Sequence, residues 1–185
     1  MKSSLLSHFA ATIIVTGIML TIYAAVQQTY RTGANDPQLQ LARDISESVH
    51  QGKSIEELLP KRTIDIAKSL SVFVAIYDSK GDTISSTGLL DGRIPQLPPG
   101  IFDFTKANGE DAVTWQPRQD VRQALVIESV ASSTVGYIAV GRSLHEVELR
   151  EANLIWMVFI AWMLCFATIL LHLLIQIYIV RKAAK

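Results

Sequence analysis

Two kinds of residue are scarce in this sequence: cysteine throughout, and charged residues over two long stretches. Cys165 is the single cysteine among 185 residues. A disulfide within the chain and a cluster of thiolate metal ligands are therefore excluded. No Asp, Glu, Lys or Arg occurs between Lys2 and Arg31, or between Glu151 and Arg181. Because about 20 apolar residues cross the roughly 30 Å hydrocarbon layer of a bilayer, both stretches are candidates for membrane spans.

The spans are predicted at residues 5–26 and 153–180, the second apolar run starting at Leu154. The first span could instead be a cleaved signal peptide. Against this, its apolar run is longer than a typical signal core, and Ile22 to Ala25 lacks the usual paired small residues before a cut. We therefore expect it to be an anchor.

Basic residues at the two ends of the chain predict its orientation in the membrane. Lys2 lies in the tail 1–4, and the tail 181–185 contains three more basic residues. Because positive charge favours the cytoplasmic side, both tails are expected there, and residues 27–152 are expected outside the cytoplasm. We expect a bacterial inner membrane, with the central domain in the periplasm.

The central segment is mildly acidic and large enough to fold by itself. All 17 acidic residues of the chain lie in it, beside 13 basic ones. This balance offers no broad basic surface for nucleic acid, which we exclude as a partner. With about 125 residues and no disulfide, the domain must be held together by a hydrophobic core.

Helices are predicted at the start of this domain. Asn35-Asp36-Pro37 combines a capping residue with an early proline, and apolar residues follow at helical spacing up to Val49. Ser54 to Glu57 is spaced as a capping box and predicts a second start. After Pro60, a short helix is expected over residues 61–70.

The hydrophobic period then changes to that of strands. Residues 72–77 form a continuous apolar run, as in a strand covered on both faces, and Asp78 to Asp82 has the composition of a turn. Residues 89–100 contain three prolines and are expected to be a loop. Further strands are predicted at residues 83–87, 113–116, 121–130 and 135–140. The fold class is therefore α+β, with helices on one side of a mostly antiparallel sheet of about five strands.

One helix is expected to run from the last strand through the second span. No proline or glycine occurs from Arg142 to the end of the sequence, and Ser143 to Glu146 form another capping box. An uninterrupted helix of roughly 40 residues would be about 60 Å long. The alternative is a bend at the membrane surface near Ala152-Asn153.

The order of these segments resembles a known family. A helix after the first span, a strand–turn–strand around Asp78-Ser79-Lys80-Gly81-Asp82, three more strands and a helix leading into the second span resemble the extracytoplasmic Cache (PAS-like) sensor region of bacterial sensor histidine kinases. Val140 to Glu148 is similar to the strand-to-helix exit of these receptors, and Ser86-Thr87-Gly88 and Val113 to Pro117 fit the same pattern. The resemblance implies signal transduction, commonly by dimers.

We do not expect the chain to be an enzyme. The resemblance would require a kinase region after the second span, whereas only residues 181–185 follow it, so we expect no catalytic output domain. The sequence also has no metalloprotease motif, nucleophile elbow or phosphate-binding glycine loop. No catalytic residue, cofactor or metal site is predicted.

Two groups of residues are candidates for function. The first could bind a small anion between the sheet and its loops, although core packing or solvent exposure would explain the same residues. Its members are Tyr77, Trp115, Arg118, Arg122 and Tyr137. The second is a pair of polar stripes, one in each span, with four-residue spacing. Its members are His8, Thr12 and Thr16 in the first span and Thr168, His172 and Gln176 in the second.

Antiparallel spans of equal depth would pair His8 with Gln176, Thr12 with His172, and Thr16 with Thr168. The stripes could then face each other or the stripes of a partner, and hydrogen bonds between spans contribute about 0.6 to 2 kcal/mol each. Equally, the threonines could bond only to their own backbone carbonyls.

Two functions are consistent with these features of the sequence. The first is a sensor-like two-pass membrane protein that binds a ligand or partner outside the cytoplasm and signals through its helices, as a homodimer or to another membrane protein. The alternative is an accessory or structural subunit of a membrane complex, with a protein-binding periplasmic domain. A polar pocket would favour the first and a flat apolar patch the second.

Overall fold

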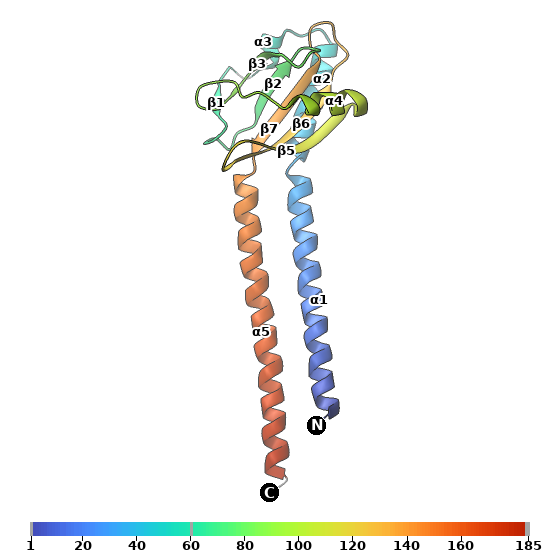
Figure 1. The fold of residues 1–185 in the computed structure, drawn as a ribbon, viewed down its shortest axis with the longest axis vertical. Helices are drawn as coiled ribbons and strands as arrows, with labels where there is room; N and C mark the ends of the chain where they lie inside the picture. The colour runs from blue at the N-terminus through green and yellow to red at the C-terminus, as the bar shows by residue number, and fades with distance from the viewer. Residues whose placement is uncertain (1, 60, 184–185) are drawn as a thin grey trace. The chain divides into compact units, whose positions relative to one another are not determined.

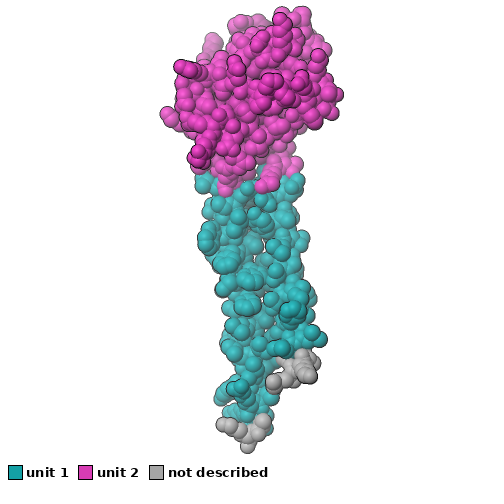
Figure 2. All heavy atoms as spheres, viewed as in Figure 1, with its two compact units in different colours: residues 1–30, 149–185 teal, residues 31–148 magenta. Residues whose placement is uncertain are grey.

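The structure is a computed structural model that describes residues 2–59 and 61–183. It divides into two compact units, shown in separate colours in Figure 2. Residues 31–148 make the sheet unit, and residues 1–30 together with 149–185 make the helix-pair unit.

The sheet unit is built around five antiparallel strands in the order β3-β2-β7-β6-β5. The longest pairings join β6 to its two neighbours, so that β6 lies inside the sheet and β3 and β5 lie at its edges (Figure 1). The α+β class with a five-stranded antiparallel sheet is thereby confirmed. The strands are β2 (Phe73–Tyr77), β3 (Thr83–Ser86), β5 (Glu110–Arg118), β6 (Val121–Ser129) and β7 (Tyr137–Ser143).

Helices cover both faces of this sheet, not one as predicted. Helix α2 (Asp36–His50) packs Ala42 and Ile45 against one face, here called the α2 face. Helix α4 (Pro99–Asn108) packs Phe102 on the opposite face, the α4 face. The error has a clear cause: β2 is buried at every position, and a strand apolar on both sides needs cover on both. Figure 1 shows the two helices with the sheet between them.

Two local predictions were wrong. The helix expected over residues 61–70 is replaced by β1 (Ile64–Asp65), which pairs in parallel with β4 (Gly88–Leu89). The carboxylate of Asp65 then accepts the backbone N–H of Ala67 at 3.0 Å, a turn that competes with helix formation. Helix α4 was not predicted, because it is short and begins in the proline-rich segment that indicated a loop.

The other helix predictions agree with the structure. Helix α2 begins at Asp36 with proline in its first turn, and the second start is the single turn α3 (Ile55–Leu58). Neither helix has a side-chain cap hydrogen bond. Helix α5 (His145–Ala183) is unbroken for 39 residues.

Helix α1 (Lys2–Gly33) and helix α5 supply the helix-pair unit. Two helical stretches, Leu5–His50 and α5, are long and apolar enough to cross a membrane, and their most apolar 18-residue windows have mean hydropathies of 2.1 and 2.5. Their most apolar windows are almost entirely exposed. Both α1 and α5 extend beyond the predicted spans into the sheet unit.

Candidate functional site

Three of the five predicted ligand contacts are buried aromatic side chains on the α4 face. Tyr77, Trp115 and Tyr137 are each at most 6% exposed and belong to one hydrophobic cluster. The ring of Phe102 from α4 lies 5.0 Å, between centroids, from the rings of Tyr77 and Tyr137. Burial raises the pKa of the Tyr77 hydroxyl well above its ordinary value, because the phenolate would lose its hydration. These rings fill the space between the sheet and α4.

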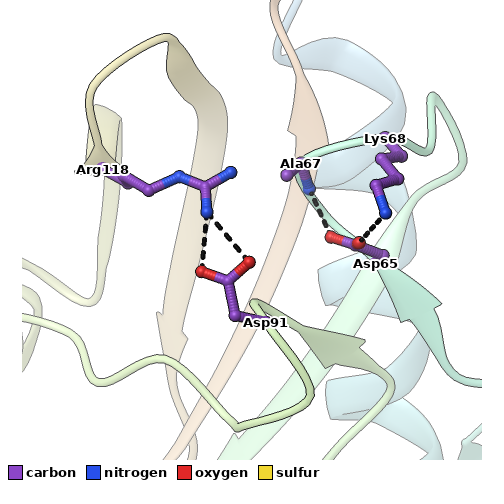
Figure 3. A network of polar contacts seen from close by, with 5 residues as sticks. All are labelled: Asp65, Ala67, Lys68, Asp91 and Arg118. Carbon is purple, nitrogen blue, oxygen red and sulfur yellow. Dashed lines mark hydrogen bonds and ion pairs between the residues drawn. The ribbon is translucent and has the colours of Figure 1, made fainter.

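The two predicted arginines are on the surface and paired with carboxylates. Arg118, at the end of β5, directs Nη1 to both carboxylate oxygens of Asp91, at 2.6 and 2.9 Å (Figure 3). Arg122, near the start of β6, donates to Glu148 in α5 at 2.6 Å. Both arginine side chains are about half exposed. The structure therefore does not bring the arginines and the aromatic rings together in one polar pocket.

Gln123 is a polar residue of this face that the prediction missed. Its side chain is 1% exposed, and its amide N–H donates to the backbone oxygen of Ile66 at 2.9 Å. Within the described part of the chain, its Oε1 atom has no hydrogen-bond partner. A buried unpaired acceptor costs about 1–3 kcal/mol, and a ligand or water that donated to it would recover that cost. The signal was visible in the sequence, because Gln123 has the same strand parity as Val121 and Leu125 and therefore lies on the same face as these apolar residues.

The junction between the sheet and α5 is held by β6. The backbone oxygen of Arg122 accepts the N–H of Leu144 at 2.9 Å, and the Arg122 side chain reaches Glu148 one turn further on. The hydroxyl oxygen of Ser143 accepts the N–H of His145 at 3.3 Å. The predicted capping box would instead place this bond on the N–H of Glu146, and helix α5 begins at His145, one residue later than the box implies. Because the Arg122–Glu148 ion pair is about half exposed, it contributes about 0–1 kcal/mol to stability. Its main effect is to fix the position of the first turns of α5 against β6. The first turn of α5 is thus tied to both β7 and β6.

The polar stripes of α1 and α5 come together in the helix-pair unit, but not in the predicted pairs. The rings of His8 and His172 are stacked with centroids 5.3 Å apart, one turn away from the expected partner Gln176. Gln176 instead forms a 2.9 Å hydrogen bond with His172 on its own helix. Thr16 accepts the indole N–H of Trp162 at 2.9 Å. The prediction equated the depths of Leu5 and Val180, whereas the observed contacts of His8 and Thr16 lie on α5 about one turn or more before the predicted partners.

The remaining two stripe residues follow the alternative that was weighed for them. The hydroxyl of Thr12 donates to the backbone oxygen of His8, and that of Thr168 donates to Leu164. Of the six predicted helix-contact residues, His8, His172 and Thr16 therefore make ring or hydrogen-bond contacts between the helices.

No group of three or more His, Cys, Asp or Glu side chains in residues 2–59 and 61–183 is arranged to hold a metal ion. Comparisons with known proteins add no assignment: no family model matches the chain, and no curated protein matches it either.

Proposed function

We propose that the chain is a sensor-like, two-pass membrane protein whose sheet unit lies outside the cytoplasm and signals through α5 to a second protein. The observation that carries the proposal is the junction. Helix α5 begins two residues after β7 ends, is bonded to β6 through Arg122, and continues without a break for 39 residues. A shift of the central strands would therefore move the first turn of a helix long enough to cross a bilayer.

The strand order supports the same proposal. The five antiparallel strands lie in the order β3-β2-β7-β6-β5, and such a sheet with helices packed on it is compatible with the PAS-like domains that the sequence resembles. Orientation follows from the basic tails, which favour a cytoplasmic position for both ends of the chain.

The input to the sheet unit is a small molecule or a protein. Gln123 favours a small molecule with a hydrogen-bond donor, since its Oε1 atom is buried and without a partner among the described residues. The packed aromatic rings of Tyr77, Phe102 and Tyr137 favour the alternative, an accessory subunit that binds a protein, because they occupy the place where a small ligand was expected.

Cysteine labelling tests the two-pass arrangement. In a Cys165→Ala background, Ser133→Cys marks the exposed turn between β6 and β7, and Lys182→Cys marks the end of α5. A membrane-impermeant maleimide should label position 133 in spheroplasts and position 182 only after permeabilisation. Labelling of both positions from outside, or of neither until the membrane is opened, would contradict the proposal.

A further inference from the structure

Strand β5 has a long free edge. Within the part of the chain that the structure describes, β5 pairs with β6 only, so its other side has no neighbouring strand (Figure 1). The backbone N–H of Ser129 donates to the oxygen of Gly109 at 2.8 Å, and the register of the two strands continues from this pair. Because alternate residues of an antiparallel strand direct both backbone groups to the same neighbour, Glu110, Ala112 and Thr114 direct theirs away from β6. The N–H and C=O groups of these three residues form a row that we call the β5 edge.

Neither α2 nor the usual protective devices close the β5 edge. The hydrophobic cluster under α2 contains residues of β2, β6 and β7 but none of β5, and the side chains of Ala112 and Thr114 are exposed. Natural sheet edges are usually blocked by a proline, by a bulge or by the shortness of the strand. In β5, which is nine residues long, the bulge and Pro117 come after Trp115. The row from residue 110 to residue 114 is therefore open to a further strand.

Two side chains beside the β5 edge indicate what its occupant supplies. Asp111 and Val113 alternate with the row and therefore point to the α4 face. Glu110 already has a partner, because Arg43 of α2 lies 3.1 Å from its carboxylate. Asp111 has no ion pair within residues 2–59 and 61–183, and Val113 is only partly buried against the cluster of the α4 face. A neighbouring strand with a basic residue opposite Asp111 and an apolar one opposite Val113 would satisfy both.

We propose that the β5 edge binds an extended segment of another protein, which joins the sheet as a further strand. The segment pairs its backbone with the N–H and C=O groups of the edge, and alternate side chains give the contact its specificity. It has a basic residue opposite Asp111 and an apolar residue two positions away, opposite Val113. The inference rests on the proposed function, because it identifies a protein as the input that the sheet unit passes to α5.

A second copy of this chain does not supply the segment. In an antiparallel pair of β5 strands, the residues that direct backbone groups to the interface pair with one another, so Asp111 is opposite another odd-numbered residue. None of these residues is basic: they are Gly109, Asp111, Val113, Trp115 and Pro117. A parallel pair about a two-fold axis sets Asp111 beside its own copy, and like charges at adjacent positions repel. The occupant is therefore a different protein.

Binding of a short peptide to the full chain in detergent micelles tests the β5 edge. The probe is the fluorescent peptide Thr-Val-Thr-Val-Thr-Lys-Thr with blocked ends, in which antiparallel pairing sets the lysine opposite Asp111. Fluorescence anisotropy should show saturable binding. Methylation of the backbone nitrogens of the third and fifth residues, which are opposite Thr114 and Ala112, removes two donors and should weaken binding about tenfold or more. No binding of the parent peptide, or equal binding of the methylated one, would overturn the proposal.

Matched variants of the chain test the same pairing from the other side. Thr114→Pro removes an outward N–H at a position where an edge strand tolerates proline, and should weaken binding about fivefold or more. Thr114→Val keeps this N–H and should bind as the parent does. Asp111→Lys should weaken binding about threefold, whereas Glu57→Lys, which reverses an exposed charge on α3, should have no effect. Equal binding within either pair of variants would contradict the proposal.

Two further measurements separate this inference from its alternative and from the proposed function. In a Cys165→Ala background, oxidation of Thr114→Cys mainly to a dimer of the chain would show that a second copy covers β5, and would overturn the proposal. Peptide binding should also change the rate at which Lys182→Cys reacts with a maleimide. Binding without such a change supports the β5 edge and refutes signalling through α5, whereas absence of binding refutes the β5 edge alone.

Discussion

The ring of Phe73 is enclosed by two glycines, and this arrangement gives the sharpest test of the sheet unit. Phe73 is 4% exposed and lies directly opposite Gly141 on β7. A methyl group on Gly141 would overlap the Cε1 and Cζ atoms of the ring, and one on Gly88 would lie 2.7 Å from Cδ2. The ring can therefore tolerate added volume on neither side.

We predict that Gly141→Ala destabilises the sheet unit by about 1–3 kcal/mol, the usual cost of overpacking a core. Phe73→Leu alone should cost about 1–2 kcal/mol through lost burial. In the double variant the smaller side chain makes room for the methyl group. Its destabilisation should therefore be less than the sum of the two single effects by well over 0.5 kcal/mol, roughly the scatter expected of independent sites.

Denaturant unfolding followed by the fluorescence of Trp115 measures these effects in the full chain. Trp156→Phe and Trp162→Phe make Trp115 the only tryptophan. Gly100→Ala is the matched control, because nothing lies within 4 Å of the position its methyl group would take. Additive effects of Gly141→Ala and Phe73→Leu, or a loss in Gly100→Ala as large as in Gly141→Ala, would refute this reasoning.

Three further predictions concern the junction, a buried tyrosine and the helix pair. Arg122→Ala and Glu148→Ala should each lower the free energy of unfolding by no more than about 1 kcal/mol, because the ion pair is about half exposed. High salt should reduce the difference from the parent chain, since it screens exposed charges. A larger loss that does not depend on salt would contradict the account. Tyr77 has its pKa raised in the folded state, so its contribution to stability is complete below the unfolded pKa of about 10 and is lost as pH rises above it. Denaturant midpoints measured between pH 9 and 11 should fall less steeply in Tyr77→Phe than in the parent. Trp162→Phe removes the hydrogen bond to Thr16 and should weaken the contact between α1 and α5 by about 0.6–2 kcal/mol, measured by steric trapping in bicelles, with Trp156→Phe as the control.

Much of the fold follows from hydrophobic period and local signals. Strand β2 was predictable from its continuous apolar run, and helix α2 from apolar residues at helical spacing. Helix α5 was predictable because none of its 39 residues is a proline or a glycine. The segment 61–70 was not, because its two-residue strand is specified by pairing with Gly88–Leu89, which is distant in sequence. Local propensity cannot report such a pairing.

The candidate site was less predictable than the fold. Side-chain type indicated Arg118 and Arg122 as anion ligands, but their partners Asp91 and Glu148 are 27 and 26 residues away in the sequence. Likewise, Tyr77 and Tyr137 are adjacent only because β2 pairs with β7. The sequence therefore shows that a charged or aromatic side chain in a strand needs a partner. Only the tertiary structure decides whether that partner is a ligand, a carboxylate of the same chain or the hydrophobic core.

The central claim is that α5 passes changes in the sheet unit to its far end, and one labelling experiment tests it most directly. Lys182→Cys, in a Cys165→Ala background, reports on the end of α5 by its rate of reaction with a maleimide. Gly141→Ala perturbs β7 two residues before that strand ends. We expect this substitution to change the reaction rate at position 182, and to have no effect once a run of glycines inserted after Ala152 interrupts the helix. Equal rates with and without Gly141→Ala in the uninterrupted chain, or the same change in the interrupted one, would contradict the account.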